Sequence, residues 1–290
     1  QGFQRHFSPD TLKSVYKLCT GLTEARKLLK EYKPDLVIGT GGYVCGPIVF
    51  LAALQGIPAC VQEQNALPGM TNKILAHFVN RIFLGYSEAD KYFKGKAKKI
   101  FTGNPIRAEV MQSTRAEGIK AFGLDSGKAT VLIAGGSLGA ASVNQAALQL
   151  EKNLSGRDDV QILHATGKNN YEDYQRQVEE LGGFKSNIHI KPYLYDMPLA
   201  LAAADIAVFR AGAIGLAELT AKGIPSILVP FPYATANHQE FNARALEAVG
   251  AAQVILDKNL TGEVLEEKIE HLLLHKEILQ KMQNAAQKAG

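Results

Sequence analysis

The stretch VLIAGGSLGAASVNQAALQL, residues 131–150, decides the fold, because it reads as an apolar strand, a glycine turn and a helix. A strand that runs through glycines into a helix directs backbone N–H groups and the positive end of the helix toward an anion. The glycines stand at 135, 136 and 139, so the G-x-G-x-x-G spacing is absent, and no Gly-Lys-Ser/Thr follows. The turn therefore predicts an anion site of a different kind.

Short apolar runs alternate with longer amphipathic runs on both sides of this stretch, which is typical of βαβ units and a parallel sheet. In the second half, strands are expected near 130–134, 160–165, 188–193, 206–209, 226–229 and 253–256, and two helices near 261–275 and 277–289. This is enough for a complete doubly wound sheet.

The first half of the sequence contains fewer βα units. Strands are expected at 35–39, 59–62 and 81–84 and in the stretch 98–107, with helices at 47–55 and 71–78. Before Asp35 the sequence shows only a helical segment, so this half resembles a Rossmann-like domain without its first units. Residues 108–128 are polar and predict a linker or a connecting helix. We therefore predict two α/β domains, 1–110 and 111–290, whose glycine loops face a shared cleft.

The composition excludes several classes of protein. With 290 residues, 46% hydrophobic and 21% charged, the chain has the profile of a soluble globular protein, and no apolar run reaches 18 residues. The first residues contain no apolar signal core. A net charge of +4 without a basic stripe interleaved with aromatic residues does not indicate nucleic-acid binding. Cys19, Cys45 and Cys60 show neither C-x-x-C spacing nor a zinc pattern, so free thiols in a reducing compartment are predicted.

Two further stretches repeat the pattern of strand, small-residue turn and helix, namely GTGGYVCGP (39–47) and VFRAGAIGLAEL (208–219). The first is explained equally well as a tight connection that binds nothing. In the second, Glu218 falls in the second turn of the helix, where a carboxylate can accept two hydroxyls of a ribose. Alone, it reads as a surface glutamate. Next to a small-residue turn, it completes an anion site and a diol acceptor, which favours a nucleoside diphosphate.

Two residue patterns that are absent from the sequence argue against particular kinds of enzyme. A dinucleotide-dependent oxidoreductase needs an acid at the end of the strand after the glycine turn, but VQILHATG ends in His164, Thr166 and Gly167. No Asp-x-Asp pair is present to hold a metal, so helix N-termini, hydroxyls and arginine must neutralise a leaving diphosphate. His238 is interpreted as a local hydrogen-bonding residue rather than a base, and Asn237 as the N-cap of the helix that begins there.

Taken together, the chain is similar to the MurG family of bacterial transferases. The resemblance runs from about Gly21 to about Ala252 and rests on six segments in order, KPDLVIGTGGYVCGP, QEQNALPGMTNK, GNPIR, LIAGGSLGA, RAGAIGLAEL and NHQEFNARAL. It implies two Rossmann-like domains in the GT-B arrangement and an inverting hexosyltransferase that uses no metal or other cofactor. Such an enzyme moves N-acetylglucosamine from UDP-GlcNAc to undecaprenyl-diphosphate-MurNAc-pentapeptide, which completes the lipid precursor of peptidoglycan.

The resemblance also implies which residues bind the donor. The family's contacts fall on Asn65, Arg107, Ser137, Leu194, Ala213, Ile214, Gly215, Leu216, Ala217, Glu218 and Gln239. Asn65 and Arg107 are expected to reach in from the first domain, and Ser137 to meet the diphosphate. Leu194 is expected beside the uracil through its backbone, and the run 213–217 around the phosphates and nucleoside.

In the same comparison Glu218 takes the ribose hydroxyls and Gln239 meets the sugar. Gly41, Gly42 and Tyr43 fall on a loop associated with the diphosphate of the lipid acceptor. The implied reaction is a direct displacement, in which the acceptor's 4-hydroxyl attacks the anomeric carbon while UDP leaves from the opposite face.

The chain departs from the family pattern in three places. It lacks the opening strand and the G-G-T-G-G-H loop, whose histidine is associated with attack by the acceptor hydroxyl. Gln62 stands where many relatives have histidine, and Gly215 where a threonine often binds phosphate. We therefore expect an N-terminally truncated member in which donor binding is better preserved than catalysis, and no catalytic base is assigned.

The family docks peripherally on the cytoplasmic face of the cell membrane, through an apolar patch ringed by basic residues. Part of such a patch is predicted on the first helical segment, from Val15, Tyr16, Leu18 and Leu22 with Lys13, Lys17, Arg26 and Lys27. An ordinary packed amphipathic helix explains this segment equally well.

Two other functions remain open at this stage. One is a non-catalytic module that binds a UDP-sugar and lends its site to a partner. The other is a UDP-GlcNAc epimerase, which shares the architecture and needs no acceptor.

Overall fold

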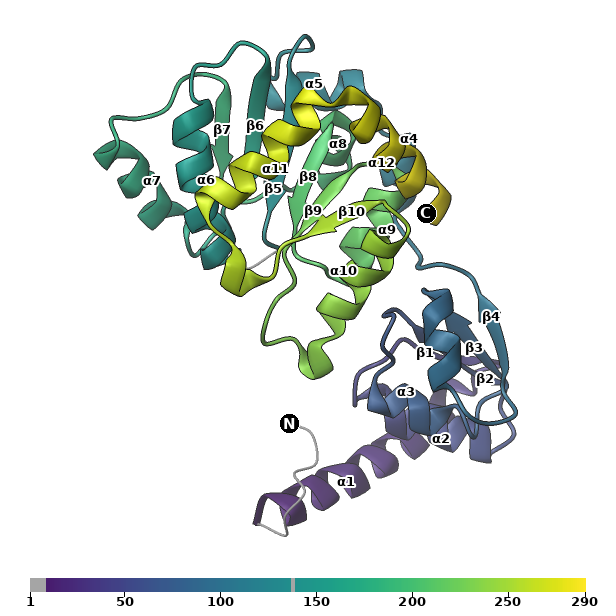
Figure 1. The fold of residues 1–290 in the computed structure, drawn as a ribbon. Helices are drawn as coiled ribbons and strands as arrows, with labels where there is room; N and C mark the ends of the chain where they lie inside the picture. Colours follow the sequence, from purple (N-terminus) through teal and green to yellow (C-terminus); the bar gives the residue numbers. More distant parts are fainter. Residues whose placement is uncertain (1–8, 137–138) are drawn as a thin grey trace. The chain divides into compact units, whose positions relative to one another are not determined.

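The computed structural model describes residues 9–136 and 139–290, and for residues 9–19 it describes only the course of a helix. The chain divides into two compact units, residues 1–104 and 105–290, hereafter the first and second units (Figure 1). The predicted boundary after residue 110 falls later than this division. The difference arises because the segment after Pro105 packs on helices of the second unit.

The first unit contains a small parallel sheet with its connecting helices. Its elements are α1 (Pro9–Tyr32), β1 (Val37–Gly39), α2 (Cys45–Leu54), β2 (Ala59–Glu63), α3 (Met70–Leu75), β3 (Arg81–Leu84), the 3₁₀ helix η1 (Ser87–Tyr92) and β4 (Lys98–Phe101). The strands follow one another in the order β1-β2-β3-β4, and every pair is parallel. This confirms the parallel α/β fold expected for this half.

Burial of apolar side chains holds this unit together. The central strand β2 is buried along its whole length, as expected for a parallel sheet with both faces covered. Val61 of β2 and Ile82 of β3 join Val49 of α2 and Leu29 of α1 in one cluster. The second half of α1 is therefore a helix packed on α2.

The second unit is larger and holds a six-stranded sheet. Its elements are α4 (Ala108–Gln112), α5 (Arg115–Phe122), β5 (Ala129–Ala134), α6 (Ala141–Leu154), β6 (Val160–Ala165), α7 (Tyr171–Glu180), β7 (Ile188–Lys191), α8 (Met197–Ala203), β8 (Ile206–Phe209), α9 (Ala213–Ala221), β9 (Ser226–Leu228), the 3₁₀ helix η2 (Thr235–Asn237), α10 (His238–Ala248), β10 (Ala252–Val254), the 3₁₀ helix η3 (Asp257–Asn259), α11 (Gly262–Leu274) and α12 (Lys276–Ala289). The strand order is β10-β9-β8-β5-β6-β7, all parallel. The predicted doubly wound sheet is confirmed.

Successive residues of β5 serve two different cores, because strand side chains alternate between the faces of a sheet. Val131 and Ile133 pack with α6 and α11 on one face. Leu132 and Ala134 pack with α8 and α9 on the other. The uninterrupted apolar run that opens the decisive stretch is therefore explained by burial on both faces (Figure 1).

Two local features of the second unit go beyond the sequence prediction. The segment 108–128, expected as a linker or a connecting helix, forms two short helices, α4 and α5. Thr114 begins α5 with a capping box in which Glu117 takes part. Asn237 occupies the N-cap position of α10 as expected. Its side chain does not cap the helix, because its backbone is left-handed and its amide donates to Glu240 Oε2 at 2.6 Å.

Candidate functional site

The order in which successive strands are added to the second sheet reverses at its centre. β5 and β8 lie side by side there, and Ala134 pairs with Phe209 at their carboxyl ends. From β5 the chain continues through β6 to one edge, and from β8 through β9 to the other. Open α/β sheets bind ligands outside the carboxyl ends of their strands at this switch point. The turn after β5 and the turn after β8 both begin there.

The glycine turn after β5 is tight because its ends touch. A Cβ at Gly135 would lie 2.5 Å from the Cβ of Ala140, so only glycine fits. Gly136 and Gly139 have φ values of +94° and +77°, which glycine adopts without strain. The Gly139 N–H donates to the Gly136 carbonyl at 2.9 Å. Ser137, predicted to meet a diphosphate, lies outside the described residues.

The turn after β8 leads directly into α9, with Gly212 as N-cap. The N–H of Leu216 already donates to the Gly212 carbonyl at 3.0 Å, and its side chain is fully buried in the core. Leu216 therefore has neither group to offer a ligand. The N–H groups of Ala213, Ile214 and Gly215 precede the first intrahelical bond and are the ones that can meet an anion. Ala217 is partly exposed one turn further on.

Glu218 lies in the second turn of α9 and pairs with Arg107. The Nε and Nη2 atoms of Arg107 donate to the same carboxylate oxygen, Oε1, at 3.1 and 2.9 Å. The carboxylate side chain is 9% exposed and the arginine side chain 50%. Within the part of the chain that the structure describes, Oε2 accepts no hydrogen bond. The pair therefore orients a buried carboxylate and leaves one acceptor oxygen for another group.

The predicted location of Arg107 was wrong. It was expected to reach in from the first domain, but the second unit begins at Pro105 and Arg107 is the residue that precedes α4. It lies in the second unit because α4 packs on α8.

Two more predicted residues lie in the second unit. Leu194 is buried against the core of this unit, so only its backbone is available to a ligand. Gln239, in the first turn of α10, accepts the N–H of Phe231 through Oε1 at 2.9 Å. His238 Nδ1 lies 2.8 Å from the Thr235 carbonyl, which confirms that it is a local hydrogen-bonding residue.

In the first unit, the loop between β1 and α2 carries Gly41 and Gly42 with φ values of +96° and +74°. The side chain of Tyr43 is exposed. Burial raises the pKa of the Cys45 thiol, so this cysteine is not an activated nucleophile. The loop thus offers backbone groups and an exposed phenol at the carboxyl edge of the sheet.

Sequence reasoning missed the residue that organises this edge, Glu63. This buried carboxylate ends β2 and accepts four hydrogen bonds. Oε1 accepts from the N–H and Nδ2 of Asn65 at 3.0 and 3.3 Å, and Oε2 accepts from the Gly69 N–H at 3.1 Å and from Asn72 Nδ2 at 2.8 Å. Asn65 is therefore held in place by Glu63. An acid at the end of a strand that begins with three apolar residues was the signal for it.

Comparison with known proteins identifies the family. Residues 130–290 match the C-terminal domain of glycosyltransferase family 28, and residues 1–84 match its N-terminal domain. The chain is 50% identical over 290 residues to the UDP-N-acetylglucosamine--N-acetylmuramyl-(pentapeptide) pyrophosphoryl-undecaprenol N-acetylglucosamine transferase of Acetivibrio thermocellus, covering 100% of this chain and 78% of that protein. The crystal structure of Acinetobacter baumannii MurG is 29% identical, with a TM-score of 0.74, over 94% of this chain and 74% of that one. The chain belongs to the MurG family of glycosyltransferases.

The two-domain α/β fold is shared beyond the MurG family. The UDP-GlcNAc 2-epimerase of Neisseria meningitidis, solved bound to UDP-GlcNAc, is 15% identical with a TM-score of 0.70, over 99% of this chain and 80% of that one. At this identity the likeness concerns the fold alone. Membership of the MurG family therefore rests on the closer relatives.

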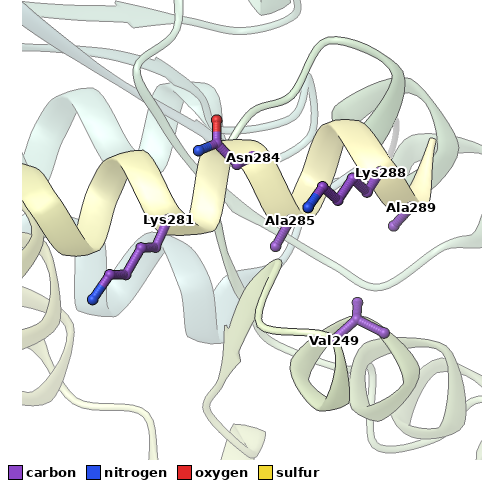
Figure 2. Close-up of a pocket in the computed structure, with 6 residues that line it drawn as sticks. All are labelled: Val249, Lys281, Asn284, Ala285, Lys288 and Ala289. Carbon is purple, nitrogen blue, oxygen red and sulfur yellow. The ribbon is translucent and has the colours of Figure 1, made fainter.

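Two further observations concern other parts of this MurG-family chain. A surface hollow beside α12 is lined by Val249, Lys281, Asn284, Ala285, Lys288 and Ala289 (Figure 2). None of the predicted site residues lines it. Among the residues that the structure describes, no three His, Cys, Asp or Glu side chains lie together as a metal ion would require.

The predicted membrane patch of the MurG family is tested only in part. The side chains of Lys13, Val15, Tyr16, Lys17 and Leu18 lie outside the described residues. Leu22 is partly buried, while Arg26 and Lys27 are exposed. No helix in the described parts of the chain is long and apolar enough to cross a membrane.

Proposed function

We propose that this chain transfers N-acetylglucosamine from UDP-GlcNAc to undecaprenyl-diphosphate-MurNAc-pentapeptide, the reaction named for its relatives in the MurG family. One observation carries the proposal beyond family membership. The turns after β5 and β8 begin at paired strand ends, and the second leads to the oriented carboxylate of Glu218. This provides backbone N–H groups and a diol acceptor in one place, as a nucleoside diphosphate requires.

The donor roles follow from that geometry. The N–H groups of Ala213, Ile214 and Gly215 meet the diphosphate, together with the glycine turn after β5. The free Oε2 of Glu218 accepts the ribose hydroxyls, and the backbone at Leu194 meets the uracil. The amide nitrogen of Gln239 remains available to a hydroxyl of the sugar, since only its oxygen is bound to Phe231.

The reaction is a displacement at the anomeric carbon. A bond forms from the acceptor's 4-hydroxyl oxygen to that carbon, the bond to the UDP oxygen breaks, and the hydroxyl proton leaves to a general base. Negative charge grows on the departing UDP. The N-terminus of α9 and the half-exposed Arg107 are the groups that stabilise it.

The acceptor is assigned to the first unit. The loop of Gly41, Gly42 and Tyr43 presents backbone groups to the diphosphate of the lipid. Asn65, which Glu63 holds in place, keeps its role as a contact to the donor.

The lipid acceptor implies a peripheral position on the cytoplasmic face of the cell membrane, and with it a role in cell-wall synthesis, cell shape and division. The first unit carries exposed apolar side chains on Leu54, Ile74 and Phe78. A Cβ at Gly95 would lie 3.1 Å from the Ala76 carbonyl oxygen, so the loop that carries the exposed Lys94 and Lys96 packs on the segment between Ile74 and Phe78. Apolar side chains rimmed by lysines are suited to an anionic lipid surface.

The test is an assay of the 290-residue chain with labelled UDP-GlcNAc and the undecaprenyl-linked acceptor. Label in the lipid fraction and release of UDP, both dependent on the acceptor, are the expected results. UDP binding without transfer identifies a non-catalytic UDP-sugar module instead. Conversion of the sugar nucleotide without acceptor identifies an epimerase, and no binding of UDP rejects the proposal altogether.

A further inference from the structure

A set of buried polar side chains in the second unit has no role in the proposed function. The four, hereafter the buried relay, are Asn144 and Glu151 of α6, His164 of β6 and Tyr174 of α7. Each is at most 4% exposed. The Tyr174 hydroxyl donates to Glu151 Oε2 at 2.7 Å, and Glu151 Oε1 lies 2.7 Å from His164 Nδ1. His164 Nε2 lies 3.2 Å from Asn144 Oδ1.

A backbone carbonyl fixes the direction of the hydrogen bonds at the Asn144 end of the buried relay. Asn144 Nδ2 donates to the Thr166 carbonyl at 2.9 Å, and a carbonyl can only accept. Asn144 therefore presents Oδ1 to His164, whose Nε2 must carry a proton. Burial raises the pKa of Tyr174, so its hydroxyl stays protonated and donates.

Such an arrangement is not explained by stability alone. Buried ionic and polar groups are often no more stabilising than apolar side chains of the same volume. What a fully bonded polar network does provide is one defined arrangement, because each misplaced member leaves a buried group unpaired. The question is then which part of the molecule the buried relay fixes.

The end of the buried relay lies directly beneath the glycine turn. A Cβ at Gly139 would overlap the Thr166 carbonyl oxygen and would lie 2.5 Å from Asn170 Nδ2. Asn170 Nδ2 also donates to this carbonyl, at 3.2 Å. Gly139 in turn bonds to Gly136 across the turn. The Thr166 carbonyl therefore lies against Gly139, and the hydrogen bond from Gly139 connects it to Gly136 on the other described side of the turn.

We propose that Asn144 is a positioning residue, oriented through His164, Glu151 and Tyr174, that holds the Thr166 carbonyl and thereby places the glycine turn for a diphosphate. The inference rests on the proposed function only for the identity of that diphosphate, UDP. It assigns the buried relay a part in affinity for the phosphates and none in affinity for the nucleoside.

The test compares Asn144→Leu with a matched control, Gln161→Leu, by measuring Kd for UDP and for uridine. Gln161 is equally buried on the same strand as His164, but at its amino end, where it bonds to Thr130 and Asp125. Asn144→Leu is expected to raise the Kd of UDP about tenfold, the cost of one misplaced hydrogen-bonding group. The Kd of uridine should change less than about twofold, and Gln161→Leu should leave both unchanged within that margin.

A second readout needs no ligand. Amide hydrogen exchange of Gly139 should accelerate in Asn144→Leu and not in Gln161→Leu, since only the former loosens the turn. If Asn144→Leu does not fold, Tyr174→Phe, which removes a single hydroxyl from the far end of the buried relay, is judged by the same two readouts.

The inference is overturned if UDP and uridine weaken by the same factor, or if exchange at Gly139 and the Kd of UDP change no more than in Gln161→Leu. A lack of UDP binding by the wild-type protein would instead contradict the proposed function. In that case the exchange of Gly139 still decides whether the buried relay holds the turn.

Discussion

Arg107 and Glu218 stand 111 positions apart in the sequence and meet in a salt bridge within one unit. An exposed ion pair contributes little to stability, because water screens it and two long side chains must be ordered. Half of the arginine side chain is exposed here, although the Glu218 side chain is only 9% exposed. The pair therefore matters more for orientation, since both donors bind Oε1 and leave Oε2 to a ligand.

The first prediction concerns that oxygen. Glu218→Gln keeps the shape of the side chain but removes its charge, and is expected to weaken UDP by about 1.5–3 kcal/mol, the range for a hydrogen bond to a charged group. Isothermal titration calorimetry with UDP measures it. The control is Asp205→Asn, which changes another arginine-bound carboxylate of the same unit at the amino end of β8. Unchanged UDP affinity in Glu218→Gln would place the ribose elsewhere.

For single residues, the sequence could indicate candidate site residues but not the side chains that they bind. Glu218 was predicted from the small-residue turn before it and Arg107 from the family resemblance, yet their contact depends on where α4 packs. Glu63 and His164 were passed over, because the value of a buried polar residue lies in its hydrogen-bond partners. Asn65 and Asn72 bind Glu63, and Glu151 and Asn144 flank His164. Only the folded chain brings these groups together.

Among the elements, the sequence predicted the strands better than the short helices. The strands 81–84, 160–165 and 206–209 were predicted to the residue, since apolar runs bounded by turn residues have few alternatives. α4 and α5 were predicted only as a linker or one connecting helix. Their sequences show no strong apolar period, and each buries little more than Val110 or Gly118. Tertiary packing on α8 decides their positions.

Two glycines within helices of the second unit should respond in opposite ways to alanine. A Cβ at Gly118 of α5 would overlap the Leu199 carbonyl oxygen of α8 and lie 3.0 Å from the Ala203 nitrogen. Overpacking costs about 1–3 kcal/mol, which exceeds the gain of about 1 kcal/mol from alanine's helix propensity. Gly118→Ala is therefore expected to lower the free energy of unfolding.

Gly215→Ala in α9 is the matched comparison, because its Cβ would meet only Phe209 Cδ1, at 3.9 Å. It should raise the free energy of unfolding by about 0.5–1 kcal/mol. Its N–H remains, so UDP affinity should stay within about twofold. Urea denaturation followed by circular dichroism measures both variants. Stabilisation by both would show that α5 can move away from α8.

For the whole molecule, charge is distributed unequally between the two units. Residues 1–104 contain 14 Lys+Arg and 7 Asp+Glu, whereas residues 105–290 contain 18 and 21. The modest net charge of +4 therefore conceals a basic first unit and a slightly acidic second one. A basic unit with exposed apolar side chains is attracted to an anionic surface, and the acidic unit is not.

This asymmetry predicts which lysines bind a membrane. Neutralising Lys94 and Lys96 to glutamine should weaken binding to phosphatidylserine vesicles by about 2 kcal/mol, since each lysine near such a surface contributes about 1 kcal/mol. Co-sedimentation with vesicles of stated composition measures the loss, and raising the salt concentration should reduce it through screening. The control neutralises Lys152 and Lys185, two exposed lysines of the second unit. Equal losses in the two double variants would mean that the chain responds to its total charge, and the assignment of the membrane surface to the first unit would have to be withdrawn.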